Sequence, residues 1–228
     1  MSAHLHKAID LLKKKILLLG ARVEESLREA VRSIELRDLE RARRVIKGDE
    51  EIDHLDVDVE EECLKVLALY QPVAVDLRFI VTVLKINTVL ERIGDVAVNI
   101  AERSEFLATQ PPVNVHFDFQ KMAEKTQSML SRSLDALVNY DVRLAREVCA
   151  ADDEVDAMNR EMYEVTKQGI RENIENLDTL IHLLATARHL ERIADLASNI
   201  AEDVIYLVRG EIVRHQEENF KQTPAGDH

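Results

Sequence analysis

The sequence contains few residues that form turns. It has only six glycines and four prolines in 228 residues. These two residue types mark turns and helix ends, so their scarcity predicts few turns and long elements of secondary structure. Tryptophan is absent, and there are only four tyrosines and five phenylalanines. An aliphatic interior suits packing between helices better than packing in sheets. With 46% hydrophobic residues the chain can still bury a core, which argues against wholesale disorder.

Positive charge is also scarce. Lysine and arginine total 30 against 43 aspartates and glutamates, which gives a formal net charge of −13. This balance argues against a protein that binds nucleic acid irrespective of sequence, because such a protein needs a basic face to neutralise phosphates. It also argues against docking on an anionic membrane by charge alone. Cations, or partners with basic patches, are favoured instead.

Long hydrophobic runs are missing. No segment approaches the ~20 uninterrupted apolar residues of a transmembrane helix, so no membrane insertion is expected. The start, Met1-Ser2-Ala3-His4, lacks the pattern of a signal peptide. Cys63 and Cys149 lie in helical patterns without C-x-x-C spacing, which predicts buried, reduced thiols. A cytoplasmic protein is expected.

Hydrophobic residues recur at steps of three and four along most of the chain, which is typical of long amphipathic helices. Asp38 and Asp118 are expected to cap helices. Gln71-Pro72 ends a helix, because the residue before proline disfavours the helical conformation. The sequence therefore predicts an all-α fold of six long antiparallel helices, at about 5–34, 39–70, 75–107, 117–139, 142–170 and 178–215.

The second half of the sequence repeats the first. Residues 91–102 and 191–202 are identical at nine of twelve positions, at an offset of 100. Upstream, residues 49–53 match 152–156 at an offset of 103. The chain is therefore predicted to be a tandem repeat of two three-helix bundles. We expect a first repeat over 1–109, a linker over 110–116 around Pro111-Pro112, a second repeat over 117–215 and a polar tail over 216–228.

Acidic side chains form stripes on the helices of both copies. On a helical wheel, Glu91, Asp95, Asn99 and Glu102 fall within an arc of about 80°, opposite the apolar face of their helix. Like charges four residues apart cost ~0.2–0.5 kcal/mol per pair, and no lysine or arginine is interspersed. The stripes therefore favour cation binding, while a merely solvated acidic face stays open. The related stripes are Glu191, Asp195, Asn199 and Glu202; Asp49, Asp53, Asp56 and Glu60; and, acidic only at its start, Asp152, Asp156, Asn159 and Tyr163.

The ligand types narrow the choice of metal. Carboxylate and amide oxygens are hard ligands that suit Mg²⁺, Mn²⁺, Ca²⁺ or iron, and the His/Cys set of a structural zinc site is missing. Glu51 and His54 form one E-x-x-H, whereas a di-iron bundle needs two. The sequence shows no Ser/His/Asp arrangement and no glycine-rich phosphate loop. The residues alone leave a carboxylate-based metalloenzyme and a plain helical scaffold open as alternatives to simple cation binding.

Three segments of the sequence are distinctive when taken together. These are Gln71-Pro72-Val73-Ala74-Val75-Asp76-Leu77-Arg78; Glu91-Arg92-Ile93-Gly94-Asp95 with Asn99-Ile100-Ala101-Glu102; and the second copy that begins at Glu191. Through these segments the sequence resembles the PhoU family, the accessory proteins of phosphate-specific transport, over roughly residues 5–210.

The resemblance implies a regulator rather than an enzyme, often dimeric. It implies partners as well: the ATPase subunit of the phosphate ABC transporter and a sensor histidine kinase, with repression of the phosphate-starvation response when phosphate is plentiful. It further implies divalent metal or iron ions on the acidic motifs. The first site would use Asp49, Asp53, Glu91, Asp95 and Asn99, and the second Asp152, Asp156, Glu191, Asp195 and Asn199.

The two copies also differ. Glu175-Asn176-Leu177-Asp178 replaces the segment that holds Arg78, so any role of Arg78 is not duplicated. Gly94 becomes Ala194, which is expected to be neutral. Asn159 and Tyr163 replace two acids, so the two sites are not expected to bind metal equally.

Overall fold

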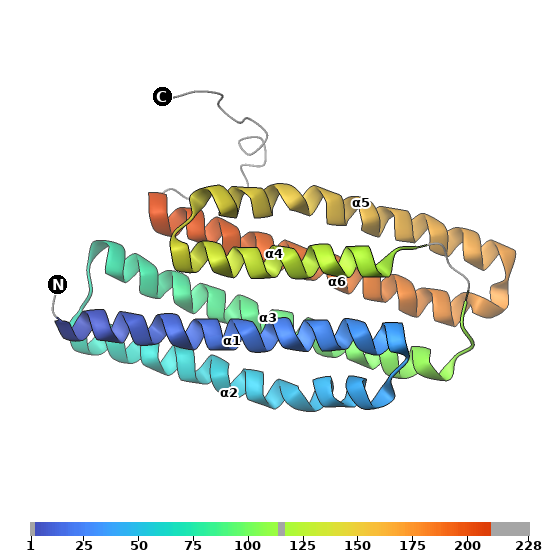
Figure 1. Cartoon of the computed structure of the whole chain (residues 1–228), viewed down its shortest axis with the longest axis horizontal. Helices are drawn as coiled ribbons and strands as arrows, with labels where there is room; N and C mark the ends of the chain where they lie inside the picture. The colour runs from blue at the N-terminus through green and yellow to red at the C-terminus, as the bar shows by residue number, and fades with distance from the viewer. Residues whose placement is uncertain (1–2, 114–116, 211–228) are drawn as a thin grey trace, which may run out of the picture.

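The computed structural model describes residues 3–113 and 117–210, and Figure 1 shows their arrangement. Helices and their connections make up this part of the chain, with no strand among the described residues. The all-α fold predicted from the sequence is confirmed. The elements are α1 (Ala3–Leu36), α2 (Leu39–Tyr70), α3 (Ala74–Thr109), α4 (Phe119–Asn139), α5 (Val142–Glu172), the short 3-10 helix η1 (Ile174–Asn176) and α6 (Leu177–Arg209).

Aspartate caps begin three of the helices, as short polar side chains do at helix N-termini. Asp38 accepts a hydrogen bond from the backbone N–H of Arg41 at 3.0 Å. Asp118 caps α4 in the same way, and Asp141 caps α5. The caps predicted at Asp38 and Asp118 are therefore confirmed.

The ends of α2 and α6 are set by left-handed residues. Gln71 has φ 44° just before Pro72, so α2 ends where the sequence predicted. Gly210 has φ 74° and ends α6 at Arg209, so the predicted helix to 215 was too long. A Cβ atom on Gly210 would lie 3.2 Å from Arg78 Nη1, which places the start of α3 against the end of α6. Residues 211–215 and the predicted tail at 216–228 lie outside the described residues.

Figure 1 shows two three-helix bundles lying side by side. Helices α1, α2 and α3 pack together, as do α4, α5 and α6. Helices α3 and α6 pack against each other where the bundles meet, and α1 also touches α4. The longest apolar faces of the fold, on α3 and α6, therefore hold the two repeats together.

The interior is aliphatic, as the composition predicted. Phe79 is the one aromatic residue among its largest fully buried side chains in the described part. Cys63 is buried, Cys149 is half-buried, and both are free thiols. Burial raises the pKa of each thiol to about 12, so both are protonated and unreactive near neutral pH.

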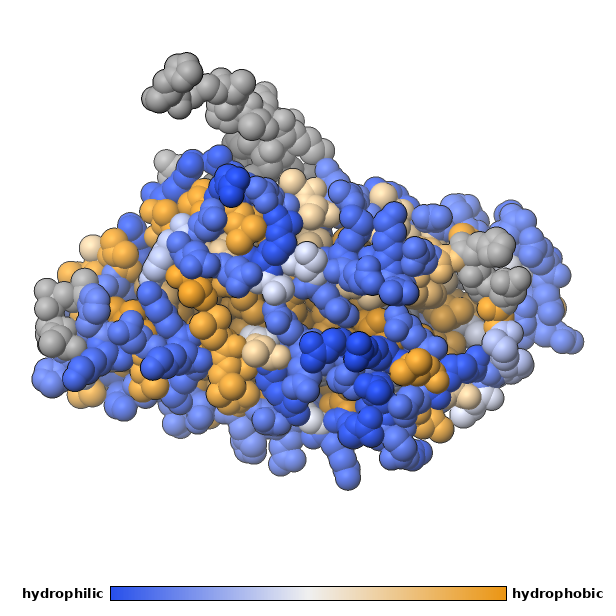
Figure 2. All heavy atoms as spheres, in the orientation of Figure 1, coloured by the Kyte–Doolittle hydropathy of each residue, from blue (hydrophilic) through white to orange (hydrophobic). Residues whose placement is uncertain are grey.

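Figure 2 shows the hydropathy of one face of the molecule. Hydrophobic side chains gather near the middle of α1, within a largely hydrophilic surface. Leu11, Leu17 and Leu18 on this helix are 42%, 37% and 58% exposed. No helix in the described ranges has the length and apolar character needed to cross a membrane.

Gly94 shows how closely α2 and α3 pack. A Cβ atom on this residue would lie 3.2 Å from Ile52 Cγ2 and 3.3 Å from Ile52 Cδ1, tighter than ordinary van der Waals contact. The corresponding positions of the second repeat hold Ala194 and Val155. Compared with the first repeat, Ala194 on α6 has one carbon more than Gly94, and Val155 on α5 has one carbon fewer than Ile52. The extra carbon of Ala194 is therefore balanced by the smaller Val155. The expectation that the glycine-to-alanine change is neutral did not include this second difference.

We predict that Gly94→Ala alone destabilises the protein by about 1 kcal/mol. Overpacking typically costs ~1–3 kcal/mol, and the helix propensity of alanine returns up to ~1 kcal/mol of this. Ile52→Val alone loses about 1 kcal/mol through the missing methylene. The double variant, with the residues of the second repeat, is expected to be more stable than the sum of the two changes by at least ~1 kcal/mol. Urea unfolding of the four proteins measures this coupling, and strict additivity would contradict it.

Candidate metal centre

In the first repeat, the acidic stripes of α2 and α3 face each other. Burial raises the pKa of Asp49, and the charges of Asp53 and Asp95 raise it further. Burial likewise raises the pKa of Glu91, with added repulsion from Asp95, Asp56 and Asp53. Carboxylates on separate helices therefore repel one another, and the site lies along the contact between α2 and α3, with Asp53 and Asp95 exposed.

Asn99 keeps its amide oxygen available in this site. Its Nδ2 donates a hydrogen bond to the backbone oxygen of Asp95 at 2.8 Å, which fixes the amide on the helix surface. The corresponding Asn199 lies exposed one turn beyond Asp195 on α6. Both asparagines thus lie on the stripes predicted from the sequence.

Asn87 belongs to the surroundings of the first site, and the sequence analysis missed it. Its Nδ2 donates to Asp56 Oδ1 at 2.6 Å and to the backbone oxygen of Asp56 at 2.9 Å. The side chain is buried, and its counterpart in the second repeat is Ala187. A polar residue in an apolar stripe was the available signal. Asp56 is therefore oriented by a partner that its counterpart Asn159 lacks.

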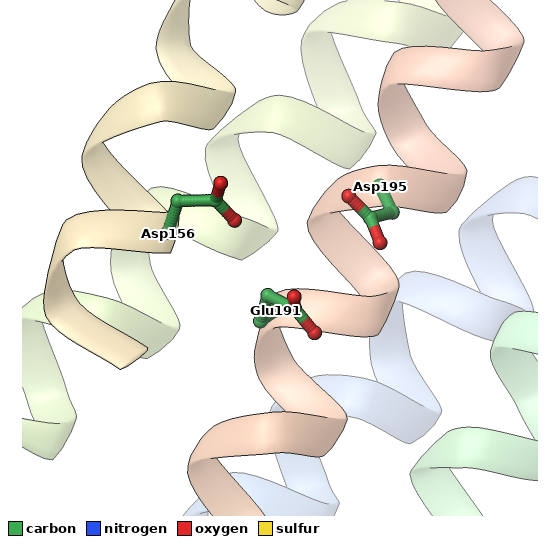
Figure 3. Close-up of side chains that lie close together, drawn as sticks. All are labelled: Asp156, Glu191 and Asp195. Carbon is green, nitrogen blue, oxygen red and sulfur yellow. The ribbon is translucent and has the colours of Figure 1, made fainter. Parts of the chain in front are cut away.

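The second repeat brings three carboxylates closest together. Asp156 of α5 and Glu191 and Asp195 of α6 each offer an oxygen, and the three oxygens lie within 4.8 Å of one another. Figure 3 shows Asp156 on α5 directed toward the two side chains on α6, which are one turn apart. No other trio in the described residues meets this distance, including the matching Asp53, Glu91 and Asp95. The repeat with fewer acids on its second helix therefore has the tighter cluster.

Asp152 adds a fourth carboxylate to this cluster. Burial raises its pKa to about 7, and repulsion from Asp195, Asp156 and Glu191 contributes. Its Oδ1 atom is buried and accepts no hydrogen bond. Burial and the neighbouring acids also raise the pKa values of Glu191 and Asp195. A buried carboxylate oxygen without a donor is unfavourable, and a cation beside it would remove that penalty.

Basic side chains do little to neutralise the two clusters. Arg160 forms an ion pair with Asp156 at 3.6 Å from a largely exposed position. Arg92 and Arg192, which directly follow Glu91 and Glu191 in the sequence, have no carboxylate within 4.0 Å among the described residues. A surface pair such as Arg160–Asp156 contributes little in water. Most of the negative charge therefore remains available to a cation.

The donor set fits a hard metal ion. It consists of carboxylate and amide oxygens from two neighbouring helices, the ligands that Mg²⁺, Mn²⁺, Ca²⁺ and iron accept. The unpartnered Asp152 Oδ1 atom supports this fit in the second repeat. What such an ion supplies here is charge neutralisation and a link between two helices.

Comparison with known proteins agrees with the repeat and with the fold. The family model of the PhoU domain matches twice, over residues 16–104 and 119–204. The chain belongs to the PhoU family. The PhoU homolog of Aquifex aeolicus, named a phosphate-specific transport system accessory protein, is 40% identical over 93% of this chain and 96% of its own length. Homolog 1 of Thermotoga maritima, with the same description, is 34% identical over 91% and 90%.

Solved PhoU structures share the fold of this PhoU family member. The crystal structure of PhoU from Pseudomonas aeruginosa matches with a TM-score of 0.86 at 32% identity, over 90% of this chain and 99% of the other. PhoU from Streptococcus pneumoniae, described as a phosphate transport system regulatory protein, matches with a TM-score of 0.82 at 28% identity, over 92% and 99%. The chain is thus a PhoU protein of the phosphate transport accessory and regulatory class.

Proposed function

We propose that this PhoU family member is an adaptor between phosphate transport and its genetic control. It would contact the ATPase subunit of the phosphate ABC transporter and a sensor histidine kinase, and repress the phosphate-starvation response when phosphate is plentiful. The observation that carries this proposal is the similarity to transport accessory proteins over more than nine-tenths of the chain. The net charge of −13 also suits partners with basic surfaces.

The proposed mechanism is differential binding. The conformational state of the transporter would change the affinity of the adaptor for the kinase, because a ligand shifts an equilibrium only by its different affinity for two states. This role needs binding surfaces and no reacting group, so we propose that the protein is not an enzyme. It would act in the cytoplasm, where both partners present their soluble parts.

We further propose that metal ions bind the two acidic sites and hold α2 to α3 and α5 to α6. The raised pKa values of Asp49, Glu91, Asp152, Glu191 and Asp195 support this role, since a cation would offset both the burial of the charged carboxylates and the repulsion between them. Divalent Mg, Mn or Ca, or iron, would suit the ligands. The proposed ligands are Asp49, Asp53, Glu91, Asp95 and Asn99, then Asp152, Asp156, Glu191, Asp195 and Asn199.

A homodimer is part of the same proposal. Leu11, Leu17 and Leu18 of α1 are exposed, and this supports a dimer because exposed apolar side chains favour contact with another protein surface. Figure 2 shows hydrophobic side chains gathered near the middle of α1.

The adaptor proposal predicts two results in the organism that supplies the gene. The purified protein should bind the transporter ATPase and the cytoplasmic part of the kinase from that organism, measured by biolayer interferometry. Deleting the gene should switch on a phosphate-starvation promoter in phosphate-rich medium, and the intact gene should restore repression. An unrelated ATPase and an unrelated kinase serve as controls. Absence of both complexes, together with normal repression in the deletion strain, would overturn the proposal.

A further inference from the structure

The contact between α3 and α6 is nearly symmetric in sequence but not in charge. At one end, Lys85 of α3 donates a hydrogen bond to Asp203 Oδ1 at 3.2 Å, and its ammonium lies 5.0 Å from the centre of the Tyr206 ring. Asp203 is only 2% exposed. A buried carboxylate at this end of the contact is thus matched by a cation from the other repeat.

The other end carries the opposite residue types. At the repeat offset of 100, Arg103 occupies the position of Asp203, and Ala185 occupies that of Lys85. Phe106 corresponds to Tyr206, and its ring stacks on His182 with 3.8 Å between ring centres. This end of the contact therefore has the cation Arg103 in place of the anion Asp203. It has the short side chain of Ala185 in place of Lys85.

Positive charge collects around Arg103. Burial lowers the pKa of His182, and the Arg103 guanidinium lowers it further, against a smaller opposing effect of Asp178. His189 lies two turns beyond His182 on the same side of α6. Arg188 and Arg192 lie beside it in the sequence, so several basic side chains gather on this stretch of α6, in a chain of strongly negative charge.

Two buried nitrogen atoms of this cluster have no hydrogen-bond partner. Arg103 Nε and His182 Nδ1 are buried and make no hydrogen bond. Arg103 also forms no ion pair with a described carboxylate. A buried donor without an acceptor costs about 1–3 kcal/mol, and most native proteins avoid it. A bound anion would accept a hydrogen bond from Arg103 Nε, and from His182 Nδ1 when that nitrogen carries the proton.

We propose that Arg103, His182 and His189 form a binding site for a tetrahedral oxyanion of the phosphate class. A guanidinium offers parallel N–H donors that match two oxygens of phosphate, and the imidazoles offer further N–H donors. The stack on Phe106 holds the His182 ring in place. Arg188 and Arg192 increase the local positive potential that draws an anion to the site.

Free inorganic phosphate and a phosphate monoester share this chemistry. If inorganic phosphate is the ligand, the protein would sense directly the nutrient whose transport its relatives serve. The site rests on the contact between α3 and α6 and involves none of the proposed metal ligands. It can therefore stand or fall independently of the adaptor and metal proposals.

The test is an NMR titration of the histidine side chains in the full chain. His182→Gln and His189→Gln variants assign the two imidazole signals. Inorganic phosphate, sulfate and O-phosphoserine are added in turn, each against sodium chloride at equal ionic strength. We expect phosphate to shift both signals and to raise the pKa of His182, because a neighbouring anion stabilises the imidazolium form. Response to inorganic phosphate but not O-phosphoserine would identify the free ion, and the reverse would identify a monoester.

Arg103→Gln should weaken phosphate binding by at least about tenfold, since it removes the charged bidentate donor. Arg143→Gln changes the same charge at an exposed position on α5 and should bind like the wild type. Arg103→Lys keeps the charge but loses the paired donors, and should give intermediate affinity even if the glutamine variant folds poorly. Imidazole signals that respond no more to phosphate than to chloride would overturn the proposal. So would equal affinities in all four proteins.

Discussion

Asp152→Asn is expected to stabilise the metal-free protein at pH 8 by about 2 kcal/mol. The folded protein raises the pKa of Asp152 from 3.8 to about 7, chiefly by burial. This difference corresponds to roughly 4 kcal/mol if unscreened, and the partial exposure of the side chain reduces it to about 2 kcal/mol. Asparagine keeps the shape and carries no charge, so the penalty disappears. The melting temperature should rise by roughly 4–8 °C for a chain of this length.

The pH dependence follows from the direction of the shift. A carboxyl whose pKa is higher in the folded state holds its proton more tightly there, so it favours folding at low pH. Stability falls as the pH rises from about 4 to about 7, and levels off above the folded pKa. The advantage of Asp152→Asn is therefore full at pH 8 and disappears toward pH 4. The lowered pKa values of His182 and His189 act in the opposite direction below about pH 6.5, but equally in both proteins.

Urea unfolding in the presence of a chelator, from pH 5 to pH 8, measures the difference between the two proteins. Glu161→Gln is the matched control, because it removes one acidic charge from an exposed position on the same helix. It should change stability little at any pH. A constant difference between Asp152→Asn and the wild type across this range would contradict the raised pKa. A destabilised Asp152→Asn variant at pH 8 would contradict the absence of a donor to Asp152.

The fold could be predicted because its signals are local and repeated. Hydrophobic residues at steps of three and four predicted the helices. Asp38 and Asp118 marked the starts of two helices, and Pro72 marked the end of one. The one clear error, the end of α6, came from following apolar periodicity past Gly210, whose left-handed backbone stops the helix. The internal repeat then predicted two three-helix bundles, because each copy of the sequence has the same apolar faces to bury.

The sequence predicted which face of each helix carries the acids of the candidate site, but not how close the acids of two helices lie. A helical wheel shows that Asp156, Glu191 and Asp195 can face one groove, but not the distance between helices that brings them together. Packing sets that distance, as the close approach of Gly94 to Ile52 does between α2 and α3 of the first repeat, and a wheel contains no information about a neighbouring helix. The same limit concealed Arg103 beside His182, since these residues lie on different repeats and at no recognisable spacing. The burial of Asp152 and the repulsion from the acids of α6, which together raise its pKa, exist only once both helices are placed.

Combined Asp95→Ala and Asp195→Ala changes are expected to abolish stabilisation by divalent ions. In the wild type, an ion present at about 100 times its dissociation constant should add roughly 2.7 kcal/mol, because it binds the folded state alone. Asp195 belongs to the closest trio of carboxylates, so Asp195→Ala alone should remove more of the effect than Asp95→Ala alone. Thermal melts with Mg²⁺, Mn²⁺, Ca²⁺ and Fe²⁺ in turn, each against chelator, measure the shifts.

The stability of the metal-free variants is a second test of the metal sites. Removing an acid from a repelling cluster should leave the metal-free protein as stable as the wild type or more stable, whereas removing a purely structural side chain should weaken it. Asp58→Ala with Glu161→Ala is the matched control, since these exposed acids occupy corresponding positions on the other sides of α2 and α5. It should keep the full metal-dependent shift. If the shift persists without Asp95 and Asp195, the ions bind elsewhere on the acidic surface, and the two stripes are only solvated faces.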